Sequence, residues 1–355
     1  MAGKDKSTVD RQFIRRVLIV LALGTLFFLA WQLRLVLLML FGAVVVASIF
    51  RALSDILRRY LKLPDAVAVG LSVIIILGLV GALVALFWAH FASQFDTLRE
   101  NLPRAWRSFE ARVGDLGLGD QLRAAMARDG GIAGGFFGNI GNTIMSVSGA
   151  IADLMVVIFG GIFLAAQPNF YSAGAIKLVP AGKRELVGEA MIDSERALRL
   201  WLRGQLLAMV LVGLLTGLGL WLLGMPSAAV LGLLAGLLEF IPFAGPVLAA
   251  IPAILLALAV SPDLALWVLL LYVVVQQVEG NILQPLIQQY AVDLPGVVLL
   301  FALIAFGTLF GIIGVILAAP LAVVSYVLVK RLYVVEALHT PTPIPGESKS
   351  AKDTP

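Results

Sequence analysis

The sequence contains no cysteine and only two histidines, His90 and His339. Without cysteine the chain can form no disulfide, no thiolate metal site and no cysteine nucleophile. The two histidines lie too far apart in sequence to suggest a zinc pair. The phosphate-binding loop, the dinucleotide fingerprint, the paired-histidine zinc motif and the serine elbow of hydrolases are also absent. We therefore predict a protein with no cofactor, no metal and no enzymatic activity.

Charged residues are scarce as well. They make up 14% of the chain, whereas 60% of its residues are hydrophobic, and the mean hydropathy is +0.99. Soluble domains are typically about 45–50% apolar and about 25% charged. A water-soluble globule is therefore excluded. The sequence predicts an integral membrane protein that does not bind nucleic acid.

Long apolar runs mark the membrane segments, because a helix needs about 20 apolar residues to cross a bilayer. The runs in the first part of the chain cover residues 17–31, 35–50, 67–88, 144–166 and 206–223. The first run follows a basic start and has no small-residue cleavage pattern, which favours a retained signal anchor over a cleaved signal peptide. The tight junction between the first two runs, at Leu33-Arg34, suggests a helical hairpin.

Residues 89–142 form a charged interruption between the third and fourth runs. Their apolar residues recur at helical spacing and would form one stripe. The stripe consists of Phe91, Phe95, Leu98, Leu102, Trp106, Phe109, Val113 and Leu116. Pro103 predicts a kink or a restart within it. We interpret the segment as a helical excursion packed on its own protein, with a subunit contact or a membrane-surface helix as alternatives.

Lysine and arginine gather in a few segments that fall on one side of the membrane. These segments are the N-terminus, 51–62, 167–204 and the end at Lys330-Arg331. The positive-inside rule assigns them to the cytoplasm. Residues 89–142 then lie on the other side, since long loops cross largely regardless of their charge. We therefore predict that both termini are cytoplasmic.

These patterns divide the chain into five segments. Residues 1–88 hold an N-terminal cytoplasmic tail and three membrane helices, and residues 89–142 form an extracytoplasmic amphipathic helical segment. Residues 143–204 hold a fourth membrane helix and a cytoplasmic amphipathic helix. Residues 205–335 form a transport core with broken helices, and residues 336–355 a disordered cytoplasmic tail.

The second half of the chain has no cation. Residues 204–329, a stretch of 126 residues, contain no lysine or arginine. The same stretch holds four carboxylates, Glu239, Asp263, Glu279 and Asp293. The two aspartates lie beside prolines, which is typical of turns. The two glutamates lie within apolar sequence and need another explanation.

A charge buried in a membrane helix costs roughly 2.5–3.5 kcal/mol on insertion scales and marks a functional site by default. No cation within their half of the chain can pair with Glu239 or Glu279. Each must be protonated, reach water, bind a cation, or pair with an arginine of the first half, such as Arg34. Asp153, inside the fourth apolar run, poses the same problem and is a candidate for coupling.

Glu239 lies just before a break in its apolar segment. Pro242 and Pro246 remove backbone donors, and Gly245 permits an unusual φ. The apolar pieces on either side are each shorter than a span. Such a break is tolerated at bilayer depth only where it is buried or lines a watery cavity, and it points to a transporter binding site. The alternative is an ordinary span with a buried proline kink.

Glu279 lies beside a series of amide side chains. Gln277, Asn281 and Gln284 follow a helical spacing that would place them on one face. Pro285 denies the Asn281 carbonyl its helical partner. An amide-lined face with one carboxylate suits a hydrated path or a polar ligand. The alternative is a helix end that emerges among the lipid headgroups.

A second broken element covers residues 296–329, which are apolar but too long for one ordinary span. Gly307, Gly311 and Gly314 interrupt it. Paired interrupted segments are typical of secondary transporters built from repeats. Three small-xxx-small pairs also predict close helix packing: Gly213/Gly217, Gly232/Gly236 and Gly307/Gly311. We predict an all-α polytopic membrane helical bundle with about seven or eight membrane segments, including two broken or re-entrant helical hairpins.

Several of these blocks together resemble one known family, the autoinducer-2 exporter family of bacterial permeases. The resemblance covers roughly residues 13–335. The blocks that carry it are Gly236–Pro246 with Glu-Phe-Ile-Pro, Gln277–Asn281 with Gln284-Pro285, Leu294-Pro295, and Gly307/Gly311/Gly314 with Ala319-Pro320. The double proline usual after the leucine is here Pro295-Gly296. The resemblance implies a bacterial inner-membrane protein that forms oligomers and either exports small molecules or exchanges sodium or lithium for protons.

We therefore predict a secondary-active permease or exporter of a small solute, coupled to protons or cations through Glu239 and Glu279. Its partners would be the lipid bilayer, a small polar solute, a monovalent cation or proton, and further copies of the chain. The predicted site comprises Glu239, Pro242, Gly245, Pro246, Gln277, Glu279, Asn281, Gln284, Pro285, Gly307, Gly311 and Gly314. A Na⁺(Li⁺)/H⁺ antiporter is one alternative, and a non-transporting membrane scaffold with residues 89–142 as its interaction arm is another.

Overall fold

The computed structural model describes residues 6–86, 88–89, 152–288, 294–340 and 342. The predictions for the apolar stripe of residues 89–142 and for Asp293 fall outside these residues, and so do residues 343–355 of the predicted tail. The helices are α1 (Lys6–Gln32), α2 (Arg34–Leu61), Asp65–Leu86, Ala152–Ala166, α6 (Pro168–Lys177), α7 (Arg184–Leu222), α8 (Ala228–Leu238), α9 (Ala244–Val260), α10 (Pro262–Val278), α11 (Gln284–Gln288) and α12 (Gly296–Leu328).

The described residues contain helices and no strand, which confirms the all-α prediction. Six helices are long and apolar enough to cross a membrane, or seven if a bent pair is counted as one span. The bent pair is Ala152–Ala166 with α6, which meet at 94°. The shorter apolar helices α8 and α9 add a broken element. The protein is therefore a polytopic helical bundle.

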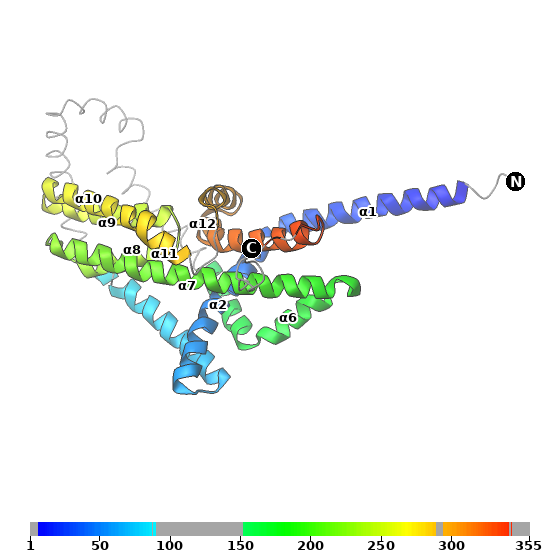
Figure 1. Ribbon diagram of the computed structural model, residues 1–355, viewed down its shortest axis with the longest axis horizontal. Coiled ribbons are helices and arrows are strands. Elements are labelled where there is room, and N and C mark those ends of the chain that lie inside the picture. Colours follow the sequence, from blue (N-terminus) through cyan, green and yellow to red (C-terminus); the bar gives the residue numbers. More distant parts are fainter. Residues whose placement is uncertain (1–5, 87, 90–151, 289–293, 341, 343–355) are drawn as a thin grey trace, which may run out of the picture.

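The junction between α1 and α2 is not the hairpin that its tightness suggests. The Leu33 amide donates to Leu29 O at 2.9 Å, and the Leu37 amide donates to Leu33 O at 2.9 Å. Helical bonding thus continues across the junction, because no glycine or proline there reverses the chain. Figure 1 shows α1 pointing away from the other helices and α2 continuing into the molecule. The hairpin prediction is wrong.

The small-xxx-small pairs of α7 and α8 pack against each other. A Cβ added at Gly236 would lie 2.5 Å from Met209 O, and one added at Gly232 would lie 2.5 Å from Gly217 Cα. Gly213 lies against both glycines of α8. Two backbones approach this closely only where neither helix carries a side chain. This contact, which the sequence predicts, fixes α8 along the apolar half of α7 (Figure 1).

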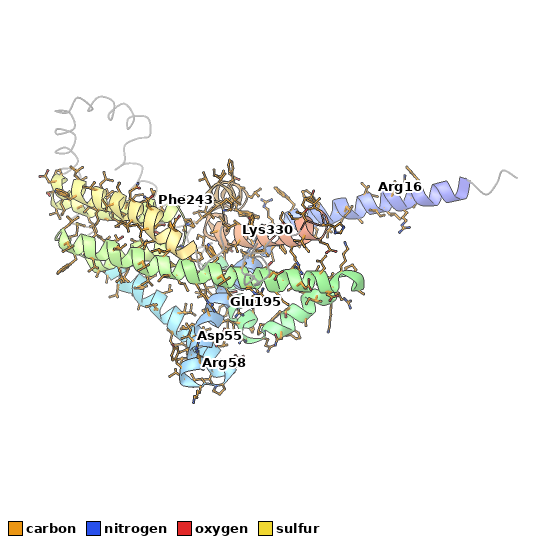
Figure 2. All side chains as sticks on the ribbon, viewed as in Figure 1. Arg16, Asp55, Arg58, Glu195, Phe243 and Lys330 are labelled. Carbon is orange, nitrogen blue, oxygen red and sulfur yellow. The ribbon has the colours of Figure 1, made fainter. Side chains whose placement is uncertain are left out.

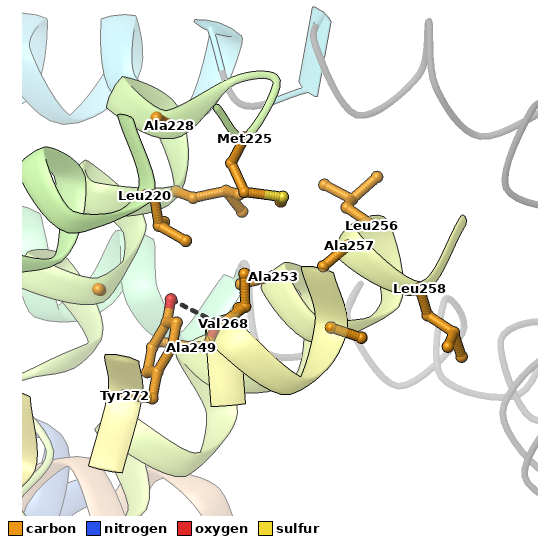
Figure 3. Packing of buried hydrophobic residues seen from close by; sticks show 13 residues of the cluster. Leu220, Met225, Ala228, Ala249, Ala253, Leu256, Ala257, Leu258, Val268 and Tyr272 are labelled. Carbon is orange, nitrogen blue, oxygen red and sulfur yellow. Dashed lines mark hydrogen bonds between the residues drawn. The ribbon is translucent and has the colours of Figure 1, made fainter. Parts of the chain in front are cut away.

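Helices α7 to α10 enclose a hydrophobic core of small and medium side chains (Figure 3). Ala249 and Ala253 of α9 are fully buried and face Val268 of α10. The Tyr272 hydroxyl donates to Ala249 O at 3.2 Å and ties the two helices together. Many alanines in this core allow close helix packing, which holds the α8–α9 break in a fixed position.

Candidate functional site

The connection between α8 and α9 is a tight turn. α8 has 11 residues and α9 has 17, so each is shorter than the about 20 residues of a full span. The two helices pack against each other and not end to end. A side chain at Gly245 would overlap the carbonyl of Leu238. Phe243 adopts φ 63° and ψ −46° to complete the turn. The predicted break at Glu239–Pro246 is therefore confirmed as a feature of the backbone.

Pro242 lies in this turn, and Pro246 lies in the first turn of α9. Neither position requires a helical N–H donor, because the first amides of a helix have no partner within it. The Gly245 amide donates to Ile241 O at 2.8 Å, and the Ala244 amide donates to Pro242 O at 2.7 Å. The prolines thus end α8 and start α9, and the amides of Ala244 and Gly245 are paired within the turn.

Glu239 caps the C-terminal end of α8 and is almost completely buried, with 2% of its surface exposed. Its backbone carbonyl accepts a hydrogen bond from Gln205 Nε2 of α7 at 2.6 Å. Its Oε2 atom is buried and has no hydrogen-bond donor among the described residues. The next residue, Phe240, packs edge-on against Trp201 of α7, with ring centroids 5.9 Å apart. The carboxyl group is therefore buried with one oxygen unsatisfied.

Glu279 begins a π-helical turn, Glu279–Leu283, between α10 and α11. The backbone N–H of Gln284 donates to the backbone carbonyl of Glu279, five residues earlier, as a π-turn requires. Pro285 explains the turn, because it has no N–H to offer to the Asn281 carbonyl and disfavours a regular helix before it. π-turns occur frequently at functional sites.

The Glu279 side chain is 5% exposed and accepts two amide hydrogen bonds. Gln276 Nε2 donates to its Oε2 at 2.9 Å, and Gln284 Nε2 donates to its Oε1 at 3.1 Å. The wider π-turn brings Gln284 round to the face of Glu279, where an α-helix would turn it away. Both carboxyl oxygens thus have a neutral donor, and neither has a cationic one.

The carboxyl groups of Glu239 and Glu279 lie close enough to interact directly. The structure thereby joins the two glutamates that the sequence places in separate breaks. Neither forms an ion pair with a lysine or arginine within the ranges that the structure describes. A carboxylate has no donor, so two ionised groups cannot satisfy each other. A single proton shared between the two groups would supply the missing donor, as in other close carboxyl pairs.

Gln277 and Asn281 do not contact Glu279. They are exposed, and Asn281 Nδ2 donates to Gln277 Oε1 at 3.0 Å and to Gln277 O at 2.9 Å. Of the predicted amide face, Gln284 is the member that the structure brings to the carboxylate. The π-turn separates the positions that a regular helix would align.

The second break lies at Gly311 of α12, where φ is 65° and ψ is −145°. A side chain at Gly314 would overlap the Phe306 carbonyl, and a Cβ at Gly307 would lie 2.9 Å from Val315 Cγ2. The glycines thus serve the bend itself, and the Gly307/Gly311 pair makes no helix–helix contact of the kind seen between α7 and α8. In Figure 1 the two pieces of α12 point in clearly different directions.

This second break approaches the first through apolar side chains. Phe310 and Phe240 pack against the same hydrophobic cluster, which is built around Trp201 of α7. No hydrogen bond between described residues joins Gly307, Gly311 or Gly314 to the two glutamates.

Asp153 is the second residue of helix Ala152–Ala166 and is partly buried. Within the described ranges, no hydrogen bond or ion pair connects it to Glu239 or Glu279.

Of the two turn aspartates, Asp263 lies in the first turn of α10, where Ser261 Oγ accepts a hydrogen bond from the Leu264 amide at 3.1 Å. This position agrees with the turn prediction for Asp263.

Sequence reasoning missed two residues of the site, Gln205 and Gln276. Each is an amide within or beside an apolar helix, which is the signal that could have found them. Gln276 comes directly before the predicted Gln277. It lies three residues before Glu279, on the same side of the helix, and binds its carboxylate. Gln205 belongs to a helix distant in sequence, and only the packing of α7 against α8 brings it to Glu239.

Comparison of the sequence with known proteins shows the family of this chain. Residues 17–333 match the family described as AI-2E family transporter. The chain belongs to the AI-2E transporter family. The resemblance that its sequence blocks carry is thereby confirmed, and this AI-2E chain is a multi-pass membrane protein of a transporter family.

Three bacterial relatives of this AI-2E chain illustrate the similarity. The protein YueF of Bacillus subtilis (strain 168) is 26% identical over 83% of this chain and 83% of its own length. YrrI of the same organism is 33% identical over 52% of this chain, and the match spans 55% of YrrI. AI-2 transport protein TqsA of Escherichia coli (strain K12) is 39% identical over 32% of this chain, and that match spans 34% of TqsA.

Proposed function

We propose that the chain is a secondary-active transporter of a small polar solute and that the pair Glu239–Glu279 couples its transport to a proton or a monovalent cation. One observation carries the proposal: two buried glutamates, 2% and 5% exposed, have interacting carboxyl groups without a cationic partner among the described residues. Both lie at helix breaks, where secondary transporters bind substrate and coupling ion.

The pair can change its charge at a fixed place in the bilayer. With one shared proton it carries a single negative charge, which Gln276 and Gln284 stabilise through their amide groups. Binding of a second proton or of a cation would neutralise the pair, and a neutral pair is far less costly to keep away from water. Rearrangement between inward-open and outward-open states would then be easiest for the neutralised form.

The solute class follows from the lining of the site and from one relative. Gln277 and Asn281 are exposed amides on the same turn as Glu279, although they do not bind its carboxylate, and they suit the hydroxyl groups of a small polar molecule. TqsA, whose name gives it as an AI-2 transport protein, matches part of this chain. A small hydrophilic signal molecule related to AI-2 is therefore the first solute to test. Pro242, Gly245, Pro246 and Pro285, together with Gly307, Gly311, Gly314 and Asp153, would shape or assist the path.

The setting is a bacterial cytoplasmic membrane with both termini on the cytoplasmic side. This orientation rests on the lysine and arginine of residues 51–62 and 167–204 and on the positive-inside rule. Residues 205–335 form the transport core, and residues 89–142 lie outside the cytoplasm. The chain works as a homo-oligomer, to which the long exposed apolar surfaces of α1 and α2 contribute.

A Na⁺(Li⁺)/H⁺ antiporter is the second candidate, and the same carboxyl pair supports it. Carboxylate and amide oxygens are hard ligands that suit small cations. In this case Na⁺ or Li⁺ would displace the shared proton directly. No separate organic solute would then be needed.

Proteoliposomes with an imposed pH gradient distinguish these candidates. We expect wild-type protein to move either a small hydrophilic signal molecule or Na⁺ and Li⁺ in response to the gradient. Glu239→Gln and Glu279→Gln should abolish this response, because a glutamine cannot release a proton. Asp263→Asn, an acid-to-amide change in the first turn of α10, is the matched control and should transport normally. Wild-type rates in both glutamate variants would refute the coupling proposal, and absence of transport by the wild-type protein itself would favour the scaffold.

A further inference from the structure

A polar pocket of about 600 Å³ lies where three membrane helices end, apart from the carboxyl pair. α2 contributes Arg51 and Arg58, helix Asp65–Leu86 contributes its first residue, and helix Ala152–Ala166 contributes its last. The first turn of α6 completes the wall. Figure 2 shows Arg58 near the end of α2 that lies farthest from α1. The transport proposal assigns no role to this pocket.

The pocket carries an excess positive charge. Arg51 Nη1 and Arg58 Nη1 both donate to the same oxygen, Asp65 Oδ1, at 2.8 Å and 2.9 Å. Arg51 Nε also donates to Ala165 O at 2.6 Å, which fixes its side chain. Two guanidinium groups and one carboxylate leave a net charge of about +1. Each guanidinium has five N–H donors, so both retain donors for a further anion.

Neutral donors line the rest of the pocket. Gln167 and Asn169 flank Pro168 at the start of α6, and both line the pocket. Arginine forks and amide groups together match the several oxygens of a phosphate group. The 600 Å³ volume is large enough for a phosphate ester and not only for the bare anion.

The pocket lies at the level of the membrane surface. The helix Ala152–Ala166 ends here, and α6 leaves it at 94°. α6 presents two aromatic rings, Phe170 and Tyr171, which are 70% and 41% exposed. Aromatic side chains of this kind are enriched at the boundary between lipid and water. Basic pockets between membrane helices at this level bind phospholipid headgroups.

From these observations we infer that the pocket formed by Arg51, Arg58, Gln167 and Asn169 binds a phosphate ester. The ester is supplied by the headgroup of an anionic phospholipid or by a soluble phosphate compound. Arg51 is held in place by Ala165 and Asp65, so Arg58, whose side chain is 47% exposed, is the group free to adjust to the ligand.

The test uses the full-length protein purified in detergent and follows its thermal unfolding midpoint. Short-chain phosphatidylglycerol, short-chain phosphatidylcholine, glycerol 3-phosphate and inorganic phosphate are titrated separately. Saturable stabilisation by phosphatidylglycerol but not by phosphatidylcholine identifies the lipid as the source. Equal stabilisation by glycerol 3-phosphate or inorganic phosphate identifies a soluble phosphate compound. Stabilisation by none of the anions overturns the inference.

Two pocket variants and one control variant locate the effect in the pocket. Arg58→Gln should raise the half-saturating concentration about fivefold, the effect of one arginine near a membrane surface. Asp65→Asn should lower it, because a competing negative charge is removed. Arg59→Gln, which makes the same charge change next to the pocket lining, should leave it unchanged. Equal effects of Arg58→Gln and Arg59→Gln would show general charge attraction and would refute a built site.

Discussion

Gln205 of α7 donates its side-chain amide to the backbone carbonyl of Glu239 at 2.6 Å. The carbonyl at a helix end has no partner within the helix and needs a donor from elsewhere. Water can supply that donor at a soluble helix end, but the end of α8 is buried. A side chain of the neighbouring helix therefore holds the break in place, and with it the position of the Glu239 carboxyl group.

Replacing Gln205 by leucine should destabilise the protein. The change leaves a buried carbonyl without a donor, which costs about 1–3 kcal/mol. Unfolding in mixed detergent micelles measures the loss. Gln32→Leu, at the exposed end of α1, is the control and should change stability little. An equal loss in both variants would mean that the Gln205 bond does not support the break.

Gly236→Ala tests the contact between α7 and α8. The added methyl group would lie 2.5 Å from Met209 O, so the two helices must move apart. Overpacking of this kind costs about 1–3 kcal/mol. The matched control is Gly81→Ala, since nothing lies within 4 Å of the added Cβ there, and it should be neutral or slightly stabilising. Unfolding midpoints of the two variants decide whether close backbone packing is required.

Gly311→Ala should disturb the bend of α12. A residue with a side chain at φ 65° and ψ −145° is strained by about 1–3 kcal/mol. The strain can be relieved by straightening the helix, so we expect transport in proteoliposomes to fall while the protein still folds. Gly296→Ala, at the helix start with open space around it, should transport like wild type. Full activity of Gly311→Ala would show that transport does not depend on the bend.

Arg331→Gln should loosen the end of the chain that follows α12. Arg331 pairs with Glu189, and its Nε lies 3.7 Å from Asp193 Oδ2, so it joins the end of α12 to α7. Asp193 is largely buried and keeps Arg196 as a second partner at 3.7 Å, so loss of Arg331 should cost only about 1 kcal/mol. Hydrogen exchange of residues 329–335 should increase. Arg203→Gln is the control on the same helix α7, and no comparable increase is expected for it.

Much of the architecture is determined by the sequence alone. An apolar run of bilayer length must pair its backbone N–H and C=O groups within itself, and a helix does so. The apolar runs therefore predict the helical class. The glycine spacing of α7 and α8 predicts their contact because only hydrogen side chains permit such an approach. The prolines and glycine at 242–246 predict the break after Glu239 because they remove helical donors.

The sequence pattern left other features undecided or predicted them wrongly. The junction at Leu33 has no residue that either forces or forbids a reversal, and the prediction of a hairpin there was wrong. The amide series after Glu279 predicts one helical face, but the turn imposed by Pro285 is a π-turn, which brings Gln284 to the carboxylate and leaves Gln277 and Asn281 outside. A local change of helical pitch is not visible in a spacing that assumes 3.6 residues per turn.

The sequence by itself determined that two glutamates lie in apolar segments without lysine or arginine in their half of the chain. Only the tertiary structure decided that they meet. Glu239 and Glu279 belong to different breaks, and their contact depends on how α8 packs on α7 and how α9 packs on α10. Composition records which charges lack a partner, whereas distance between helices is set by packing, and packing is a property of the whole fold.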